Sequence, residues 1–428
     1  MKKLIAISVV FALVAGTVFA VDVTGTVFGK ANVLKGSTAK DDTVRATGEM
    51  PRIRLDGAGE AGDGEYGGYV RFQSDIKAYV ARTEPDYDGD DQMASNRFLL
   101  VDSAYAWWKP IDQFKLIIGT NSDGMWGKEG VTGWNFNQMP YDGGIATNPG
   151  IWYGNYWASG HYVGRPFMNN RYTFFEGWLD WGVGMEITPT DMVGINVAIP
   201  YEAGSGHGPK AGSKDHADDA KYIYQAAIFQ VDLKFDFGNI AITYDGGGRA
   251  VYGNPVESTG AIYAYAGLNV IENLGLDIGF SFHMKGNEDY GQNKESLPIG
   301  IGVGAHYKAD AFGIKFRTTA AVAGNEKGNA SDLTYINTSV LPYFVINDNL
   351  VGFLNVGLGV LMGDSDKVKS VTGNSTNLGW YFNPYLRVGA EWGPSFYAGL
   401  EVKSDGAKHA DNKTIVEWSV PIALMVSF

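Results

Sequence analysis

Apolar and polar residues alternate with a period of two along most of the chain. In the last stretch, TIVEWSVPIALMVSF, every second position from Phe428 back to Val416 is apolar, and the positions between them are mixed. The same alternation recurs in GYVRFQSDIKAYV, LDIGFSFHMK, PIGIGVGAHYK and GIKFRTTAAV. It predicts β-strands with one apolar and one polar face, because successive side chains of a strand point to opposite sides. Helical periodicity is nearly absent, so we expect an all-β protein.

The segments between the predicted strands alternate between short and long. The short turns are KPIDQ, TPTD, DFGN, IENLG, ADAFG, INDN and EWGP. The long polar segments are residues 34–47, 82–97, 123–170, 202–220, 247–259, 285–296, 325–332, 364–377 and 404–412. Short connections at one end of a sheet and long ones at the other are typical of an up-and-down antiparallel transmembrane β-barrel. We expect about 18 strands, including a short one at PRIRLDG, with about 16 as the alternative.

The first twenty residues predict a segment that is removed from the mature protein. MKKLIAISVVFALVAGTVFA has a basic start, an apolar stretch, and small residues at Val18 and Ala20. This pattern predicts a signal peptide over residues 1–20, which leaves 21–428 as the barrel. The apolar stretch is too short to span a membrane, and no later segment reaches about 18 consecutive apolar residues, so we expect no membrane helix.

Composition supports a barrel over a soluble β-sandwich, which also shows alternation. Glycine accounts for 58 of 428 residues, aromatic residues for 13%, and cysteine is absent. An exported chain without disulfides must be stabilised in another way, and closed β pairing is one such way. No linker divides the chain into several sandwich domains. The net charge of −13 argues against a nucleic-acid partner, because phosphate binding needs a basic surface.

The last predicted strand matches the height of a membrane. The ten steps from Trp418 to Phe428 rise roughly 25 Å at the tilt of barrel strands, with an aromatic residue near each interface. We therefore expect the apolar face to meet lipid and the face with Glu417 to meet a watery interior. Closure requires this strand to pair with the first one, which we expect around Val21 to Val27.

A terminal Phe preceded by apolar residues at alternate positions resembles the assembly signal of Gram-negative outer-membrane barrel proteins. Its residues here are Trp418, Leu424, Val426 and Phe428. With the signal peptide and the strand rhythm, the resemblance covers essentially the whole chain. In length and strand number the chain is similar to porins, either general ones of about 16 strands or substrate-selective ones of about 18. The resemblance implies an outer-membrane location, contact with lipid and lipopolysaccharide, insertion by the barrel-assembly machinery, and a homotrimer.

The longest connection, residues 123–170, is the third long loop, and the third loop of porins folds inward and narrows the pore. The resemblance implies the same role here, and a loop of this length usually has a function. Within it, MPYDGG is similar to the Pro-Glu-Phe-Gly-Gly-Asp stretch of general porins, with the acid, Asp142, displaced. Its aromatic residues either offer stacking surfaces to sugar rings or pack the loop against the wall, and both interpretations stay open. They include Trp126, Trp134, Tyr141, Trp152 and Trp157.

Strand phase predicts which charged side chains face the lumen. The basic ones are Arg52, Arg54, Arg71, Lys77 and Lys115, and the acidic ones after the long loop are Glu176, Asp180 and Glu186. General porins set a basic ladder against acids on the inward loop. By this resemblance, we hypothesise that the three arginines face Asp142 or Asp123 across a constriction. The alternative is that the arginines are solvated in a wide vestibule. Lumenal bases and acids nearly balance, so the ion preference stays open.

We expect a pore for passive diffusion of small hydrophilic solutes and ions, without a cofactor and without enzyme activity. Two alternatives stay open: a substrate-selective porin for saccharides or small anions, and a surface adhesin or structural barrel that displays its loops. In EPDYDGDD, residues 84–91, Asp86, Asp88 and Asp90 are spaced like a calcium loop. No Glu follows at the twelfth position, so we expect no metal site there.

Overall fold

The computed structural model describes residues 20–39, 43–75, 100–121, 179–200, 227–245, 261–283, 299–322, 334–363, 378–390, 394–404 and 415–428. These residues form one antiparallel sheet of nineteen strand segments. The segments are β1 (Ala20–Ser37), β2 (Arg45–Ala61), β3 (Tyr66–Asp75), β4 (Leu100–Ile111), β5 (Phe114–Asn121), β6 (Leu179–Thr190), β7 (Val193–Pro200), β8 (Ile228–Phe235), β9 (Gly238–Asp245), β10 (Ala261–Ile271), β11 (Leu274–His283), β12 (Ile299–Lys308), β13 (Phe312–Val322), β14 (Thr334–Asn347), β15 (Leu350–Met362), β16 (Leu378–Gly389), β17 (Ser395–Gly399), β18 (Glu401–Ser404) and β19 (Glu417–Ser427). The described residues contain no helix that is long and apolar enough to cross a membrane.

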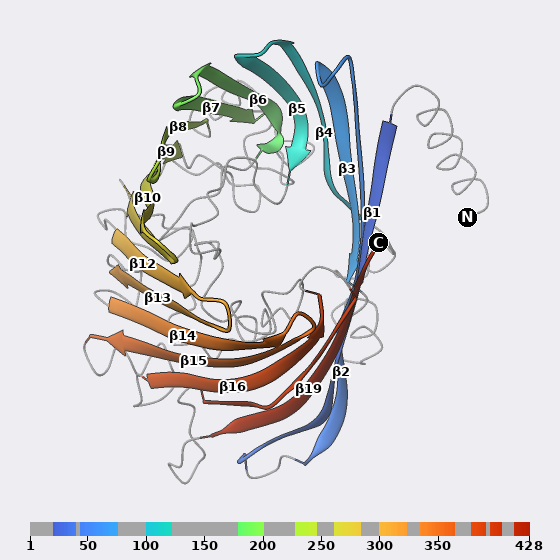
Figure 1. Cartoon of the computed structure of the whole chain (residues 1–428), viewed down its shortest axis with the longest axis vertical. Coiled ribbons are helices and arrows are strands. Elements are labelled where there is room, and N and C mark those ends of the chain that lie inside the picture. The colour runs from blue at the N-terminus through green and yellow to red at the C-terminus, as the bar shows by residue number, and fades with distance from the viewer. Residues whose placement is uncertain are drawn as a thin grey trace, which may run out of the picture.

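The strands close into a ring, in which β1 lies beside β19 (Figure 1). Segments β17 and β18 both pair with β16 and β19, so together they make one crossing, and the barrel has eighteen. The expected strand number of about 18 is therefore confirmed over the alternative. The split lies opposite Pro384, whose nitrogen carries no proton to donate to the Leu400 carbonyl. The side-chain amide of Asn383 donates to that carbonyl instead, at 2.8 Å.

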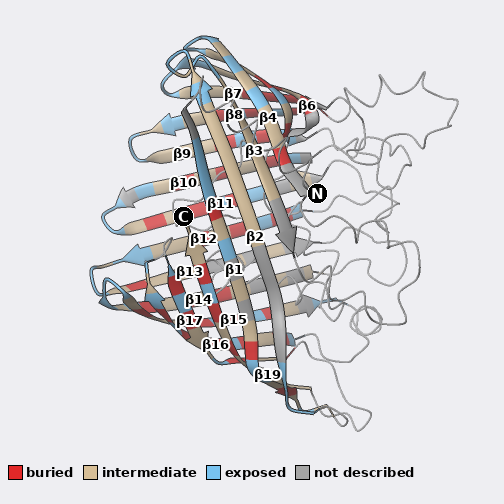
Figure 2. Ribbon diagram, turned by 90° about the vertical axis from the view of Figure 1, so that its right-hand side faces the viewer, coloured by how far each residue is buried: buried red, intermediate tan, exposed pale blue. Residues whose placement is uncertain are grey.

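The turns that the structure describes lie at one end of the barrel (Figure 2). One of them, residues 62–65 between β2 and β3, was not predicted from the sequence. Three of its residues have positive φ angles, 62° at Gly62, 54° at Asp63 and 88° at Gly64. This conformation favours glycine, which occupies two of the three positions. The predicted short strand at PRIRLDG is part of β2, which runs for 17 residues. That prediction was wrong in length because Gly57, Ala58, Gly59 and Ala61 are too small to show an apolar alternation.

Closure joins β1 to β19 over a longer stretch than the one expected around Val21 to Val27. The register runs from Thr26 opposite Ser427 to Ser37 opposite Glu417. The backbones of Gly25 and Phe428 exchange two further hydrogen bonds, of 2.7 and 2.9 Å. The first residues of β1, from Ala20 on, pair with β2 instead. The last strand does pair with the first, but mainly with its second half.

The two faces of the sheet have the opposite polarity to that of a soluble protein. On β16, Asn383 is only 1% exposed, whereas Phe382 and Leu386 on the other face are 40% and 48% exposed. The concave side of a closed sheet crowds its side chains, so the buried polar residues face inward and the exposed apolar ones outward. A soluble domain buries its apolar side chains. The outer face is therefore the surface that meets hydrocarbon, which confirms the transmembrane barrel.

Two aromatic residues of the predicted assembly signal pack on glycines of β1. A Cβ atom added to Gly25 would lie 2.5 Å from the ring of Phe428, and one added to Gly36 would lie 2.9 Å from the ring of Trp418. Gly29, on the same strand, has nothing within 4 Å of such an atom. Glycine thus leaves space for an aromatic ring at both ends of the pairing between β1 and β19.

We expect Gly25→Val and Gly36→Val each to destabilise the folded barrel by about 1–3 kcal/mol, the usual cost of overpacking. Gly29→Val is the matched control, and we expect it to stay within about 0.5 kcal/mol of the wild type because its site is open. Urea unfolding in lipid vesicles measures all three. Equal stability of the three variants would contradict the packing of Phe428 on Gly25 and of Trp418 on Gly36.

Candidate pore lining

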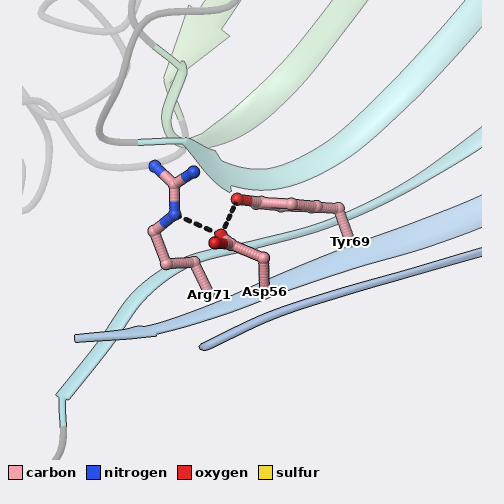
Figure 3. A network of polar contacts seen from close by, with 3 residues as sticks. All are labelled: Asp56, Tyr69 and Arg71. Carbon is pink, nitrogen blue, oxygen red and sulfur yellow. Dashed lines mark hydrogen bonds and ion pairs between the residues drawn. The ribbon is translucent and has the colours of Figure 1, made fainter. Parts of the chain in front are cut away.

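The inner wall at β2 and β3 carries a network of three polar side chains, Asp56, Tyr69 and Arg71 (Figure 3). Asp56 lies opposite Arg71 in the strand register, and Tyr69 precedes Arg71 by two residues on the same face. The Tyr69 hydroxyl and the Arg71 Nε both donate to Oδ1 of Asp56. The side chains of Arg71 and Asp56 are 14% and 17% exposed, so this ion pair is largely shielded from solvent. Figure 3 shows the two terminal nitrogens of Arg71 pointing away from Asp56.

Aromatic rings support this network from one side. The Arg71 guanidinium lies 5.5 Å from the ring centre of Tyr69, within the range of a cation–π contact. The ring centres of Tyr69 and Tyr105 are 5.2 Å apart. The ring centres of Tyr105 and Trp107 are 6.1 Å apart. The rings on β3 and β4 thus form a continuous row beside the charged groups.

A second ion pair joins β5 to β6. Lys115 Nζ lies 3.3 Å from Oε2 of Glu186, which is opposite it in the register. Lys115 also lies 5.5 Å from the ring centre of Trp107. Both basic groups are therefore held in the same way, by an acid on the neighbouring strand and by a ring. The sequence pointed to lumenal positions for Arg71, Lys115 and Glu186, but it did not indicate that the bases pair with neighbouring acids.

The other predicted pore residues are described only in part or not at all. Arg52 and Arg54 lie at alternate positions of β2, in phase with Asp56, and Asp180 lies near the start of β6, where the pairing with β5 is irregular. The structure does not describe the side chains of Arg52 and Asp180. The remaining predicted residues lie outside the described residues, namely Lys77, Asp123, Asp142, Glu176, Trp126, Trp134, Tyr141, Trp152 and Trp157. The predicted signal peptide, residues 1–20, lies outside them except for Ala20, the first residue of β1, and the calcium-like spacing at 84–91 lies outside them altogether.

A buried polar network that the sequence did not single out lines β7, β8 and β9. Asn196 Nδ2 donates to Asp232 Oδ2 at 2.8 Å, and Gln230 Nε2 lies 3.0 and 3.1 Å from the two Asp232 oxygens. The Thr243 hydroxyl donates to Gln230 Oε1 at 2.9 Å. The only signal in the sequence was their polar character at alternate positions of short strands. The network makes this part of the wall polar and fixed in shape.

Farther round the ring, the wall becomes aromatic. The Tyr343 hydroxyl of β14 lies 3.0 Å from Nε2 of His306 on β12. The Tyr343 ring occupies the space that a side chain at Gly313 on β13 would fill. Phe353 and Tyr385 stack at 4.6 Å with an interplanar angle of 5°. Tyr343 and Tyr385 are buried, so these rings belong to the wall itself. Within the part of the chain that the structure describes, no group of three or more His, Cys, Asp or Glu residues could hold a metal ion.

A closed ring of eighteen antiparallel crossings, with polar side chains inside and apolar ones outside, defines an up-and-down transmembrane β-barrel. Similar solved structures include Salmonella typhi OmpF in complex with daunomycin, at 11% identity over 95% of this chain and 97% of that chain, with a TM-score of 0.47. The chain is also similar to an anion-selective porin from Comamonas acidovorans, at 11% identity, 95% and 99% coverage and a TM-score of 0.46. OmpT, an outer membrane protein of Vibrio cholerae, has 10% identity, 95% and 97% coverage and a TM-score of 0.45. No protein-family model and no curated protein matches the chain.

Proposed function

We propose that the chain is an outer-membrane pore for passive diffusion of small hydrophilic solutes and ions. One observation carries the proposal: polar and charged side chains line the concave face of a closed barrel, and exposed apolar side chains cover its outer face. Such a wall can solvate a permeating ion, whereas the outer face is compatible with lipid. No covalent step and no cofactor is part of this function.

The proposal also includes the features implied by the resemblance to porins. Residues 1–20 direct export and are removed, and the loop over 123–170 folds inward and sets the size limit. The barrel-assembly machinery recognises the terminal strand with Phe428, and the mature protein forms a homotrimer in contact with lipopolysaccharide. The predicted basic and acidic residues face each other at the constriction.

Single-channel recording tests this function directly. We expect the pure protein to insert into planar bilayers and to open them to ions in discrete steps. Insertion without conductance would contradict the proposal and favour a barrel that only displays its loops. Saturable block by one saccharide, lost in Trp126→Ala or Trp152→Ala, would instead indicate a selective porin.

A further inference from the structure

We propose that the wall between β14 and β1 opens locally along one line of backbone pairing while the rest of the barrel stays closed. The strands concerned follow one another around the ring (Figure 1). The line, which we call the proline line, consists of residues that lie opposite one another on these strands, namely Pro342, Leu354, Pro384, Leu400 and Val420. The inference concerns a motion of the wall and does not depend on what passes through the barrel.

The first observation is that three of these strands have a proline in their interior. They are β14 with Pro342, β16 with Pro384 and β19 with Pro421. A proline has no N–H to donate, so within sheets it is usually confined to edges, first residues and bulges. A closed barrel has no edge, and each of these prolines therefore removes one hydrogen bond from the wall. Because a missing backbone partner is costly at membrane depth, the three prolines mark a weak part of the barrel.

The strand registers show where these bonds are lost. The described pairing of β14 with β15 skips Pro342, although it is regular on both sides of it. The Leu400 N–H donates to the Pro384 carbonyl at 2.9 Å, but in the return direction the Asn383 side chain replaces the missing N–H of Pro384. On the other side of the same segment, β17 and β18 pair with β19 before and after Pro421 but not at it. Each proline thus interrupts the pairing of its strand with one neighbour.

The interruption continues into β1. The register of β1 with β19 shifts between Asn32 and Leu34, so that Val33 is an extra residue, and the register with β2 shifts between Asn32 and Lys35. A bulge of this kind disrupts the hydrogen-bond ladder locally. Irregular pairing therefore extends over four consecutive strand interfaces, from β16 to β2. By contrast, β11 pairs with β12 over nine consecutive residues without a shift.

Polar side chains accompany the proline line on the inner face of the wall. Each is buried and is the chain neighbour of a residue of the line; they are Asn355, Asn383, Glu401 and Ser419. Asn383 already replaces one missing ladder bond. When the pairing opens, the freed backbone groups therefore meet polar groups on the inner side of the wall. This lowers the cost of opening, which would be prohibitive if only hydrocarbon surrounded them.

Hydrogen exchange of the folded barrel in lipid vesicles, followed by mass spectrometry, measures local opening. We expect peptides from β17, β18 and β19 to exchange about tenfold faster than peptides from the regularly paired β11 and β12. The measurement needs only the wild-type chain, so it tests the proposal even if a variant does not fold.

A variant that restores a missing donor tests the cause. Pro384→Val keeps an apolar side chain on the outer face and supplies the N–H that proline lacks. We expect it to slow exchange around Leu400 about fivefold, the factor that corresponds to one hydrogen bond. Leu386→Val is the matched control, because Leu386 lies on the same face of β16, is 48% exposed and already has an N–H. We expect its exchange to equal that of the wild type.

Three results would overturn the proposal. The first is exchange in β17, β18 and β19 as slow as in β11 and β12, which would mean that the prolines only shape a rigid wall. The second is a folded Pro384→Val barrel that exchanges like the wild type, and the third is a Leu386→Val barrel that slows as much as Pro384→Val. A folded barrel that conducts no ions would contradict the proposed function alone, because the exchange comparison does not involve conductance.

Discussion

Replacing Ile278 by Arg is expected to destabilise the folded barrel by about 2–4 kcal/mol in a lipid bilayer. Ile278 lies in the middle of β11 on the outer face, where its side chain is 45% exposed. In a soluble protein, a charge at such an exposed position is nearly neutral for stability. In a barrel it is placed at the centre of the hydrocarbon layer, where the guanidinium loses its hydration. Urea unfolding of the barrel in lipid vesicles measures the difference.

The matched control for this change is Ile271→Arg on the neighbouring strand β10. Ile271 is 56% exposed, but it lies at the strand end, beside the turn at Glu272 and Asn273. A charge near the interface costs only about 0–1 kcal/mol. Both variants replace an exposed isoleucine of the outer face by arginine, and they differ in the depth of that position in the membrane. Equal and small effects at both sites would contradict a membrane-spanning outer face.

Much of the fold could be predicted because lipid and water impose a simple pattern on a barrel. Strands with large apolar residues on one face were recognised from their alternation, as β11 and β19 illustrate. The pattern failed where those residues are absent. At the end of β2, glycines 57 and 59 occupy the outward positions and contribute to a shallow recess of about 640 Å³ in the wall. Without side chains there is no alternation, so the sequence suggested a strand that ends too early.

The missed end of β2 also explains why the pairing of Asp56 with Arg71 was not predicted. Strand phase gives the face on which a residue lies, but the register between two strands depends on the turn that joins them. The turn over residues 62–65 places Ala61 opposite Tyr66, and this alignment brings Asp56 opposite Arg71. The contact between Lys115 and Glu186 could not be predicted from a turn at all, because residues 122–178 separate β5 from β6. Their contact follows only from the order of strands around the closed barrel.

Lumenal polar networks differ from surface polar groups because the concave wall buries them. Asp232 is only 6% exposed, although it faces the interior of a barrel that we propose to be water-filled. Its carboxylate is packed among side chains of β7 and β8, so the amide donors that it accepts from have little access to water. The stability of this wall therefore depends on hydrogen bonds to one carboxylate.

We expect Asp232→Ala to destabilise the barrel by about 2–4 kcal/mol, because it leaves the amides of Asn196 and Gln230 buried without their acceptor. Asp236→Ala, in the exposed turn of the same hairpin, is the control, and we expect a change within about 0.5 kcal/mol. The double variant Asn196→Ala with Asp232→Ala should lose less stability than the sum of the single losses, because the contact can be lost only once. Urea unfolding in vesicles measures this cycle, and strict additivity would mean that Asn196 and Asp232 do not interact in the folded barrel.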